Sequence, residues 1–304
     1  MARIAFLGLG VMGAPMARNL AAGGHAVTGF DVDSRALRAA GVATADSAAE
    51  AARDAEIVIT MLPKGEHVKA ALFGDRGASS TLPAGAMIID MSTVQPLETD
   101  EIARAALERG HRFVDAPVGR SSQHAIDGTL LIMAGGEAAD VEAARPVLAL
   151  MGDPIVHCGG RGTGARAKIV NNYMSIVSNV VVAESLVLAE ASGLDRQVAI
   201  DICRGTTAGQ GHLNTTWPAK VLKGDTSPGF MIDLAHKDLL IGLELAARLG
   251  APSACGAAAR PVYEIARAKG RGRDDWTAML EVLQGEGGSG DRSGGGDRAA
   301  NPAG

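Results

Sequence analysis

Short apolar runs alternate with amphipathic, alanine-rich segments over the first half of the chain. The apolar runs lie at 3–7, 27–31, 57–62, 87–91, 112–115 and 129–136. Their lengths are those of buried strands, and helical patterns at 14–22, 47–56 and 98–110 separate them. Strands that alternate with helices predict a parallel, doubly wound sheet, so we expect an α/β fold in this half.

The pattern changes after about residue 160, where the strand-like runs stop. Residues 165–193 form one long helical pattern that ends at Gly193, a residue type typical of helix C-termini. Further helical patterns follow at 195–204, about 230–249, 254–269 and 274–283. We therefore predict three parts, which are a doubly wound domain at 1–161, an all-α domain at 162–284 and a disordered Gly-rich tail without chemistry at 285–304.

The helical segment 165–193 is unusually long and apolar. Such a helix is typical of a spine buried between domains or subunits rather than of a surface element. The chain contains no stretch of about 18 uninterrupted apolar residues, so we expect no membrane span. This segment and the helical second half of the chain favour at least a homodimer.

Composition narrows the possible functions. Of the 304 residues, 47% are hydrophobic, 21% charged and 3% aromatic, and the formal net charge is −5. Nucleic-acid binding needs clustered basic residues and often stacking rings, so it is not expected. Cys158, Cys203 and Cys255 have neither a CxxC nor a metal-ligand spacing, which indicates reduced thiols in a cytoplasmic protein without a metal site.

Residues 4–13, IAFLGLGVMG, place Gly8, Gly10 and Gly13 in a GxGxxG spacing between a strand and a helix. The first glycine makes the tight turn, the second lets the backbone approach a pyrophosphate, and the third permits close helix–strand packing. The pyrophosphate meets free N–H groups at the positive end of the helix dipole. With Asp31 at the end of the second strand, the pattern predicts a Rossmann domain; an incidental glycine turn is the alternative.

Asp31 also bears on the choice of cofactor. A carboxylate at this position accepts hydrogen bonds from the adenosine ribose and repels a 2′-phosphate, which favours NAD(H) over NADP(H). The other predicted cofactor contacts, in the glycine turn and after a later strand, are Val11, Met12, Met61, Leu62 and Pro63. The three that follow the later strand are equally compatible with a place in the core.

Five ordered motifs, GLGVMGAPMARNL, MLPKGEHV, DMST, GTGARAKIVNN and AHKDL, together resemble the β-hydroxyacid dehydrogenase family over about residues 1–284. That family includes 3-hydroxyisobutyrate, tartronate-semialdehyde and 6-phosphogluconate enzymes. The resemblance implies a Rossmann domain, a helical C-terminal domain, a substrate cleft between them and a lysine acid/base. It also allows a homotetramer as well as a homodimer. It assigns catalysis to Lys168 with Asn172, and it places Ser92, Thr93 and Lys237 near the substrate and the nicotinamide.

These residue types suit the reduction of an aldehyde. Negative charge grows on the carbonyl oxygen as hydride arrives, and an ammonium beside that oxygen supplies both charge and proton. In the oxidation direction the amine must be neutral, and burial would lower its pKa. Asn172 lies four residues after Lys168, so both can face one pocket. The alternative is that Lys168 is a surface lysine, with its aliphatic part along the helix and its ammonium in water.

Residues 115–122, DAPVGRSS, depart from the Ser-Gly-Gly turn that holds a substrate carboxylate in most of the family. Arg120 adds a charge and a fork of donors after Gly119, and the hydroxyls of Ser121 and Ser122 can bind a third oxygen. A sulfonate or phosphate presents three oxygens, whereas a carboxylate presents two. We therefore predict an anion clamp, with a surface or interdomain salt bridge as the alternative for Arg120.

This turn and the segments at 170–175 and 205–220 resemble the sulfolactaldehyde reductases of bacterial sulfoglycolysis, a branch of the same family. The resemblance implies reversible, NADH-dependent reduction of 3-sulfolactaldehyde to 2,3-dihydroxypropane-1-sulfonate. It places around the substrate the residues Asn171, Asn172, Tyr173, Met174 and Ser175.

Two other functions stay open at this stage. The first is reduction of a carboxylate semialdehyde (succinic, tartronate or methylmalonate), since only residues 119–122 separate the two substrate classes. The second is NAD(H) binding without chemistry, against which Lys168 argues. We interpret His124 as a polar loop residue rather than an acid/base. Weaker candidates for the pocket or a subunit interface are His212, Trp217 and Asp233.

Overall fold

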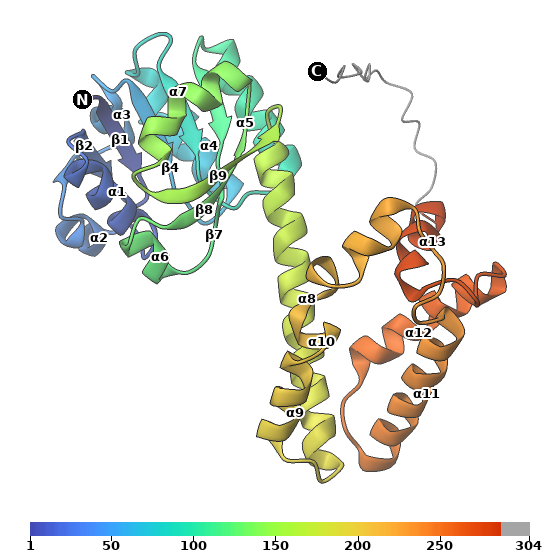
Figure 1. The fold of residues 1–304 in the computed structure, drawn as a ribbon. Coiled ribbons are helices and arrows are strands. Elements are labelled where there is room, and N and C mark those ends of the chain that lie inside the picture. Colours follow the sequence, from blue (N-terminus) through green and yellow to red (C-terminus); the bar gives the residue numbers. More distant parts are fainter. Residues whose placement is uncertain (287–304) are drawn as a thin grey trace. The chain divides into compact units, whose positions relative to one another are not determined.

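The computed structural model describes residues 1–286 and divides into two compact units that meet within one helix, at Ser175 and Ile176 (Figure 1). The boundary expected from the sequence, at 161/162, lies just before the first residue of that helix, Thr163. Apart from residues 285–286, which end the last helix, the predicted tail lies outside the described residues.

One sheet organises the first unit. Its strands are β1 (Arg3–Leu7), β2 (Ala26–Phe30), β3 (Ala43–Thr44), β4 (Ile57–Thr60), β5 (Met87–Asp90), β6 (Arg112–Asp115), β7 (Val118–Gly119), β8 (Leu130–Gly135) and β9 (Gly152–Gly159). Over the described chain the strand order is β3-β2-β1-β4-β5-β6-β8-β7, and β9 pairs with β8. β1 pairs in parallel with β2 and β4, so the carboxyl ends of these strands meet at one edge.

The predicted parallel pairing is confirmed from β3 to β6, but it is wrong at β8. β8 runs antiparallel to both β6 and β7, and β9, which the apolar pattern missed, then runs parallel to β8. A parallel crossover needs a dozen or more residues. Only residues 120–129 separate β7 from β8, so the chain turns back instead.

Helices cover both faces of this sheet. They are α1 (Gly13–Ala22), α2 (Ser34–Ala39), α3 (Ala48–Ala52), α4 (Gly65–Phe73), α5 (Pro96–Glu108), α6 (Ser122–Ile126) and α7 (Ala138–Leu148). Successive strand residues face opposite cores because side chains alternate along a strand. Ile89 packs with Met16 of α1, whereas Ile88 packs with Leu72 of α4 and Ile102 of α5. The doubly wound architecture is therefore confirmed.

The second unit has helices and, apart from an isolated bridge between Met231 and Asp275, no strand over its described residues, as predicted. Its helices are the C-terminal part of α8 (Thr163–Ala191), α9 (Arg196–Arg204), α10 (Thr207–Gln210), α11 (Ile232–Leu249), α12 (Ala254–Ala268) and α13 (Met279–Glu286). The helix expected at 274–283 is instead a 3₁₀ turn at Trp276–Ala278 that leads into α13. The small core of this unit is formed by Ile232, Ala266, Ala278 and Val282.

α8 is exposed along most of its length in a single chain. Its buried residues are Gly164 and Ala165, both in the first turn. By length and composition alone, it is the one helix of the described chain that could cross a membrane. Large apolar side chains exposed on it include Val170, Tyr173, Met174, Ile176 and Val182. The buried spine expected from the sequence is therefore not buried within one copy of the chain.

Candidate active site

The glycine turn after β1 has the geometry of a pyrophosphate cradle. Gly8 has φ +101°, and a Cβ there would lie 2.3 Å from the Met61 carbonyl oxygen. A Cβ on Gly13 would lie 1.9 Å from the Gly8 carbonyl oxygen, so the helix can pack here only without a side chain. Beside Gly10 there is open space, since a Cβ at that residue would meet no atom within 4 Å. The three positions thus have the backbone geometry and the space that the motif requires.

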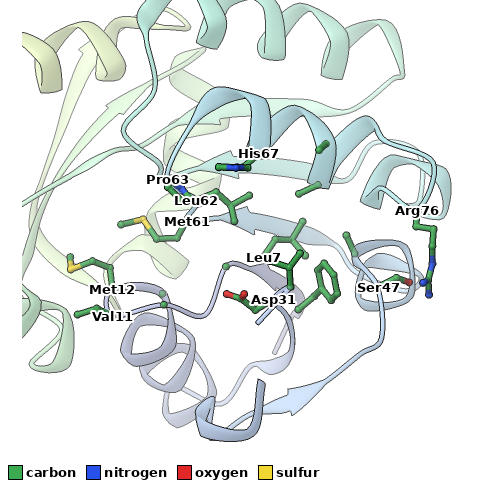
Figure 2. Close-up of a pocket in the computed structure, with 18 of the residues that line it drawn as sticks. Leu7, Val11, Met12, Asp31, Ser47, Met61, Leu62, Pro63, His67 and Arg76 are labelled. Atoms are coloured by element: carbon green, nitrogen blue, oxygen red, sulfur yellow. The ribbon is translucent and has the colours of Figure 1, made fainter. Parts of the chain in front are cut away.

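A cleft of about 710 Å³ opens beside this turn (Figure 2). Val11 and Met12 lie at one end of it and Ser47 and Arg76 at the other, with Asp31 between them. All the sequence-predicted residues of the glycine turn, together with Met61, Leu62 and Pro63, line the cleft. The sequence reasoning missed Ser47, His67 and Arg76, because they lie on the loops and helices after β3 and β4, where no motif marks them.

Asp31 connects the end of β2 to the glycine turn. Its Oδ2 accepts a hydrogen bond from the Leu9 N–H at 2.7 Å, and its Oδ1 accepts one from the Asp33 N–H at 2.8 Å. Each carboxylate oxygen keeps a further lone pair for a ribose hydroxyl. Arg35 is paired with Asp33 at 3.1 Å, and its hydrogen bond lowers the pKa of the Asp33 carboxyl. Arg35 is therefore engaged by Asp33 and forms no ion pair with Asp31, whose carboxylate disfavours a 2′-phosphate.

A buried hydrogen-bond network fixes the ends of β4 and β5. Asp90 accepts from the Thr60 hydroxyl at 2.8 Å and from the Ser92 N–H at 3.0 Å. The Ser92 hydroxyl in turn accepts from the Leu62 N–H at 2.9 Å. Burial raises the pKa of Asp90. The predicted substrate residue Ser92 is thus buried and holds the Leu62 turn in place, whereas Thr93 is exposed on a neighbouring hollow.

Asp115, the last residue of β6, accepts hydrogen bonds from the start of α8. The sequence did not mark it as a site residue. Its Oδ1 accepts from the Gly162 N–H at 2.7 Å, and its Oδ2 accepts from the Ala165 N–H at 2.8 Å. Burial raises the pKa of Asp115 to about 6, and these two backbone hydrogen bonds oppose the shift. The only signal in the sequence was a carboxylate at the carboxyl end of a predicted strand.

Lys168 lies on α8 one turn after Ala165 and is half-buried. Burial lowers the pKa of its ammonium group. Within residues 1–286, no hydrogen bond or ion pair of this ammonium is present. Asn172 follows one turn later and accepts a hydrogen bond from the Asn171 amide at 3.3 Å. The amine is therefore available to a ligand, and its proton is more easily lost than that of an exposed lysine.

The remaining predicted residues of this region differ in exposure and in location. Tyr173 is 72% and Met174 51% exposed, and Ser175, the last residue of the first unit, is also exposed. Lys237 lies in the second unit, on α11, where it pairs with Asp238 at 3.1 Å. The structure therefore brings Lys168, Asn171 and Asn172 together on one helix, and it places Lys237 in the other unit.

Arg120 occupies a strained backbone position in the turn after β7. Within the described chain it is the one non-glycine residue with positive φ, at 78°. The Nη1 group donates to the carbonyl oxygens of Thr129 at 2.5 Å and Asp153 at 3.1 Å. The side chain is exposed, and no hydrogen bond of its Nε or Nη2 group is found within residues 1–286. Two donors of the guanidinium are therefore free.

The residues after Arg120 form the first turn of α6. The Ser121 hydroxyl lies 2.8 Å from His124 Nδ1, and the two residues form a reciprocal capping box. His124 is therefore on a short helix rather than in the loop that the sequence predicts. Ser122 is exposed at the start of the same helix. The turn presents an arginine and two hydroxyls on consecutive residues.

The three weaker candidates lie in the second unit. His212 packs edge-on against Trp276, with ring centroids 4.8 Å apart, and lines a hollow of about 630 Å³. Trp217 begins a 3₁₀ turn, and Asp233 accepts a hydrogen bond from Arg267 at 2.6 Å. Asp233 is therefore engaged in a local ion pair.

Comparison with known proteins gives the class to which this site belongs. Residues 3–160 match the family model of the NAD binding domain of 6-phosphogluconate dehydrogenase. Residues 162–283 match the model described as NAD-binding of NADP-dependent 3-hydroxyisobutyrate dehydrogenase. The chain is therefore an NAD-binding oxidoreductase. It belongs to the 3-hydroxyisobutyrate dehydrogenase-like, or β-hydroxyacid dehydrogenase, family.

Individual relatives align over almost the whole chain. The 3-sulfolactaldehyde reductase of Escherichia coli K12 is 51% identical, over 93% of this chain and 96% of its own length. The NAD-dependent L-serine dehydrogenase of Pseudomonas aeruginosa is 36% identical, over 93% and 98%. The solved structure of Mycobacterium tuberculosis 3-hydroxyisobutyrate dehydrogenase with L-serine is 36% identical, with a TM-score of 0.66 and coverage of 93% and 99%.

Proposed function

We propose that the protein reduces 3-sulfolactaldehyde to 2,3-dihydroxypropane-1-sulfonate with NADH, reversibly, with Lys168 as general acid/base and Arg120 as sulfonate clamp. The 51% identity to a 3-sulfolactaldehyde reductase supports this assignment. The observation that carries it is Arg120 at φ 78°, a conformation that favours glycine. Strain of this kind costs about 1–3 kcal/mol and is found at ligand clamps and active sites.

The clamp follows from the donors that the turn leaves free. Nη1 of Arg120 is held by two backbone carbonyls, which orient the guanidinium, while Nε and Nη2 remain for a ligand. The hydroxyls of Ser121 and Ser122 lie on the next two residues. The Ser121 hydroxyl is bonded to His124 Nδ1 at 2.8 Å and would exchange that contact for the ligand. With Nε, Nη2 and the Ser122 hydroxyl, the turn then offers donors for three oxygens, which a sulfonate presents and a carboxylate does not.

The half-buried amine of Lys168 performs the proton transfer. NADH bound in the cleft beside Gly10 supplies the hydride. The ammonium of Lys168 stabilises the negative charge that grows on the carbonyl oxygen and then donates a proton to it. Because burial lowers the pKa of Lys168, the neutral amine is accessible for the reverse reaction. The amide of Asn172 orients the same oxygen.

The remaining proposed contacts complete the site. For the substrate they are Gly119, Ser92, Asn171, Tyr173, Met174 and Ser175, and for the cofactor Thr93 and Lys237. Asp31 selects NADH over NADPH because its charge is not offset by Arg35. The three cysteines are free thiols, which supports a cytoplasmic location.

The exposed apolar face of α8 packs against a second copy of the chain. Val170, Val177 and Val181 lie on one side of the helix and are 40–70% exposed, which is unusual for aliphatic side chains on one helix. A membrane is a poor alternative occupant, because Glu184 on the same helix is engaged in capping α12 through the Cys255 N–H. A homodimer or homotetramer would bury the face in a protein core.

A substrate panel tests the proposed function. NADH consumption is measured with 3-sulfolactaldehyde and with succinic, tartronate and methylmalonate semialdehydes, and NAD⁺ reduction is measured with L-serine. We expect kcat/KM for 3-sulfolactaldehyde to exceed the others by at least about 10²-fold, as loss of a charged hydrogen bond suggests. A higher kcat/KM for any carboxylate would replace the sulfonate assignment with the carboxylate alternative.

A further inference from the structure

The carboxylate of Asp115 joins the sheet to the helix that carries the catalytic lysine. It lies at the carboxyl end of β6 and is 1% exposed. The first N–H groups of a helix have no partner within the helix. Two N–H groups at the start of α8, those of Gly162 and Ala165, donate to the two oxygens of this one carboxylate.

Glycines bring the surrounding backbone close to this carboxylate. A Cβ on Gly164 would lie 2.9 Å from Asp115 Oδ2 and 2.3 Å from the Met133 carbonyl oxygen. A Cβ on Gly135 would lie 2.7 Å from Asp115 Oδ1. No side chain larger than hydrogen fits at either position without a shift of the backbone. The start of α8 is therefore packed directly against β6 and β8.

A second contact holds the same turn from outside. Arg166 donates to both carboxylate oxygens of Asp100 on α5, at 3.0 and 2.7 Å. This pair is largely exposed, so it contributes little energy, but it restricts rotation of the helix about its axis. The first turn of α8 is thus fixed on two sides, and the buried side is fixed by Asp115.

Electrostatic stabilisation of the fold does not explain why a carboxylate occupies this position. Burial raises its pKa to about 6, and the negative charge of Asp90 on β5 acts in the same direction. The charge of Asp115 contributes to raising the pKa of the Arg166 guanidinium. Burial raises the pKa of the Cys158 thiol on β9, and the charge of Asp115 raises it further. At neutral pH an ionised carboxylate in this place costs folding free energy. Groups that are kept at such a cost are typical of functional sites.

We propose that Asp115 is a positioning residue for the proton transfer, because it fixes the start of α8 and thereby the location of Lys168. The proposal rests on the function proposed for Lys168. Lys168 lies three residues after Ala165, on the same face of the helix and about 4.5 Å further along its axis. A displacement of about 1 Å between reacting groups can reduce a rate by about 10²-fold.

Asp115→Asn tests this role with little change in shape. One amide oxygen can still accept an N–H, but the amide nitrogen then faces the other N–H. We expect kcat for aldehyde reduction to fall 10- to 100-fold while the Kd of NADH stays within twofold. The matched control is Asp140→Asn, which removes a carboxylate bonded to Arg112 on the same strand, away from α8. It should leave both quantities within twofold.

A double-mutant cycle shows whether Asp115 acts through the lysine. In a Lys168→Ala background, Asp115→Asn should lower kcat by less than twofold, and a full additional loss would overturn the proposal. Wild-type kcat in Asp115→Asn would also overturn the positioning role of Asp115. If Lys168→Ala still lost activity in that case, the proposed function would be unaffected. Wild-type kcat in Lys168→Ala would instead reject the acid/base role that the proposed function gives to Lys168. If Asp115→Asn does not fold, Asp115→Ser, whose shorter side chain still carries one hydrogen-bond acceptor, is used for the same comparison.

Discussion

Nη1 of Arg120 lies 3.1 Å from the carbonyl oxygen of Asp153, at the start of the strand that follows α7. The same group also donates to the Thr129 carbonyl oxygen. The arginine is therefore anchored by backbone atoms that substitution elsewhere would not remove. Its remaining donors are fixed in direction before any ligand arrives, and a preorganised clamp loses less entropy on binding.

Removal of the Arg120 guanidinium should weaken substrate binding more than catalysis. In Arg120→Ala we expect KM for 3-sulfolactaldehyde to rise by about 10²–10³-fold, with a smaller change in kcat, because a charged hydrogen-bonded contact is lost. Steady-state kinetics check this. Arg145→Ala, which removes an exposed arginine paired with Glu142, is the control and should leave KM unchanged. An unchanged KM in Arg120→Ala would refute the clamp.

Arg120→Gly separates function from stability at the same position. Glycine adopts φ 78° without strain, so this variant should unfold at a urea concentration no lower than that of Arg120→Ala. It should nevertheless share the raised KM for the sulfonate substrate. Urea unfolding and kinetics on the two variants provide the check, and a lower midpoint for the glycine variant would contradict the strain at this residue.

The amine of Lys168 should determine kcat without contributing to cofactor affinity. In Lys168→Ala we expect kcat to fall by about 10²–10⁴-fold, the usual contribution of a general acid or base. The Kd of NADH, measured by fluorescence titration, should stay within twofold. Intact turnover in this variant would show that another group donates the proton.

The charge of Asp31 should determine cofactor preference. Asp31→Asn keeps an acceptor for the Leu9 N–H but removes the repulsion of a 2′-phosphate, so the ratio of the Kd values of NADPH and NADH should fall at least about tenfold. The paired variant Asp33→Asn/Arg35→Gln removes an ion pair without changing the net charge. It should leave the ratio nearly unchanged, and an equal fall in both proteins would argue against the role of Asp31.

The pH dependence of stability should report the buried carboxylate of Asp115. Its folded-state pKa of about 6 lies above the ordinary value of 3.8, so the native state holds the proton more strongly than the unfolded state. The resulting stabilisation is fully present below about pH 4 and is lost as the pH rises through 6. It amounts to about 2–3 kcal/mol.

Asp115→Asn lacks this titration, whereas Asp90 titrates in both proteins. The free energy of unfolding of the variant, relative to wild type, should therefore rise between pH 4 and pH 7. Urea unfolding across that range measures the difference. A relative stability that falls with pH would mean that Asp115 has a lowered pKa and that its hydrogen bonds outweigh its burial.

The exposed face of α8 predicts an oligomer in solution. Light scattering on the wild-type protein should give at least twice the mass of the 304-residue chain. Val177→Asp, which places a charge on this face, should shift the protein toward monomer, whereas Glu108→Ala on α5 should not. A monomeric wild type would contradict the second copy as the occupant of this face.

The sequence by itself determined the elements whose signals are local. The GxGxxG spacing, the acidic end of β2 and the apolar periods predicted the nucleotide cleft and most helices, because backbone conformation and burial of one face leave a pattern within a few residues. Arg120 became a candidate through the family resemblance, because an arginine lies where most of the family has glycine.

Only the tertiary structure decided which distant residues meet. Asp115 bonds to N–H groups 47 and 50 residues further along the chain, and Thr60 bonds to Asp90 across 30 residues. These pairs follow from strand order and from the reversed direction of β8, which no local period records. The exposure of α8 likewise depends on what packs against it. Periodicity shows that a face is apolar, but its neighbours in space decide whether it is covered.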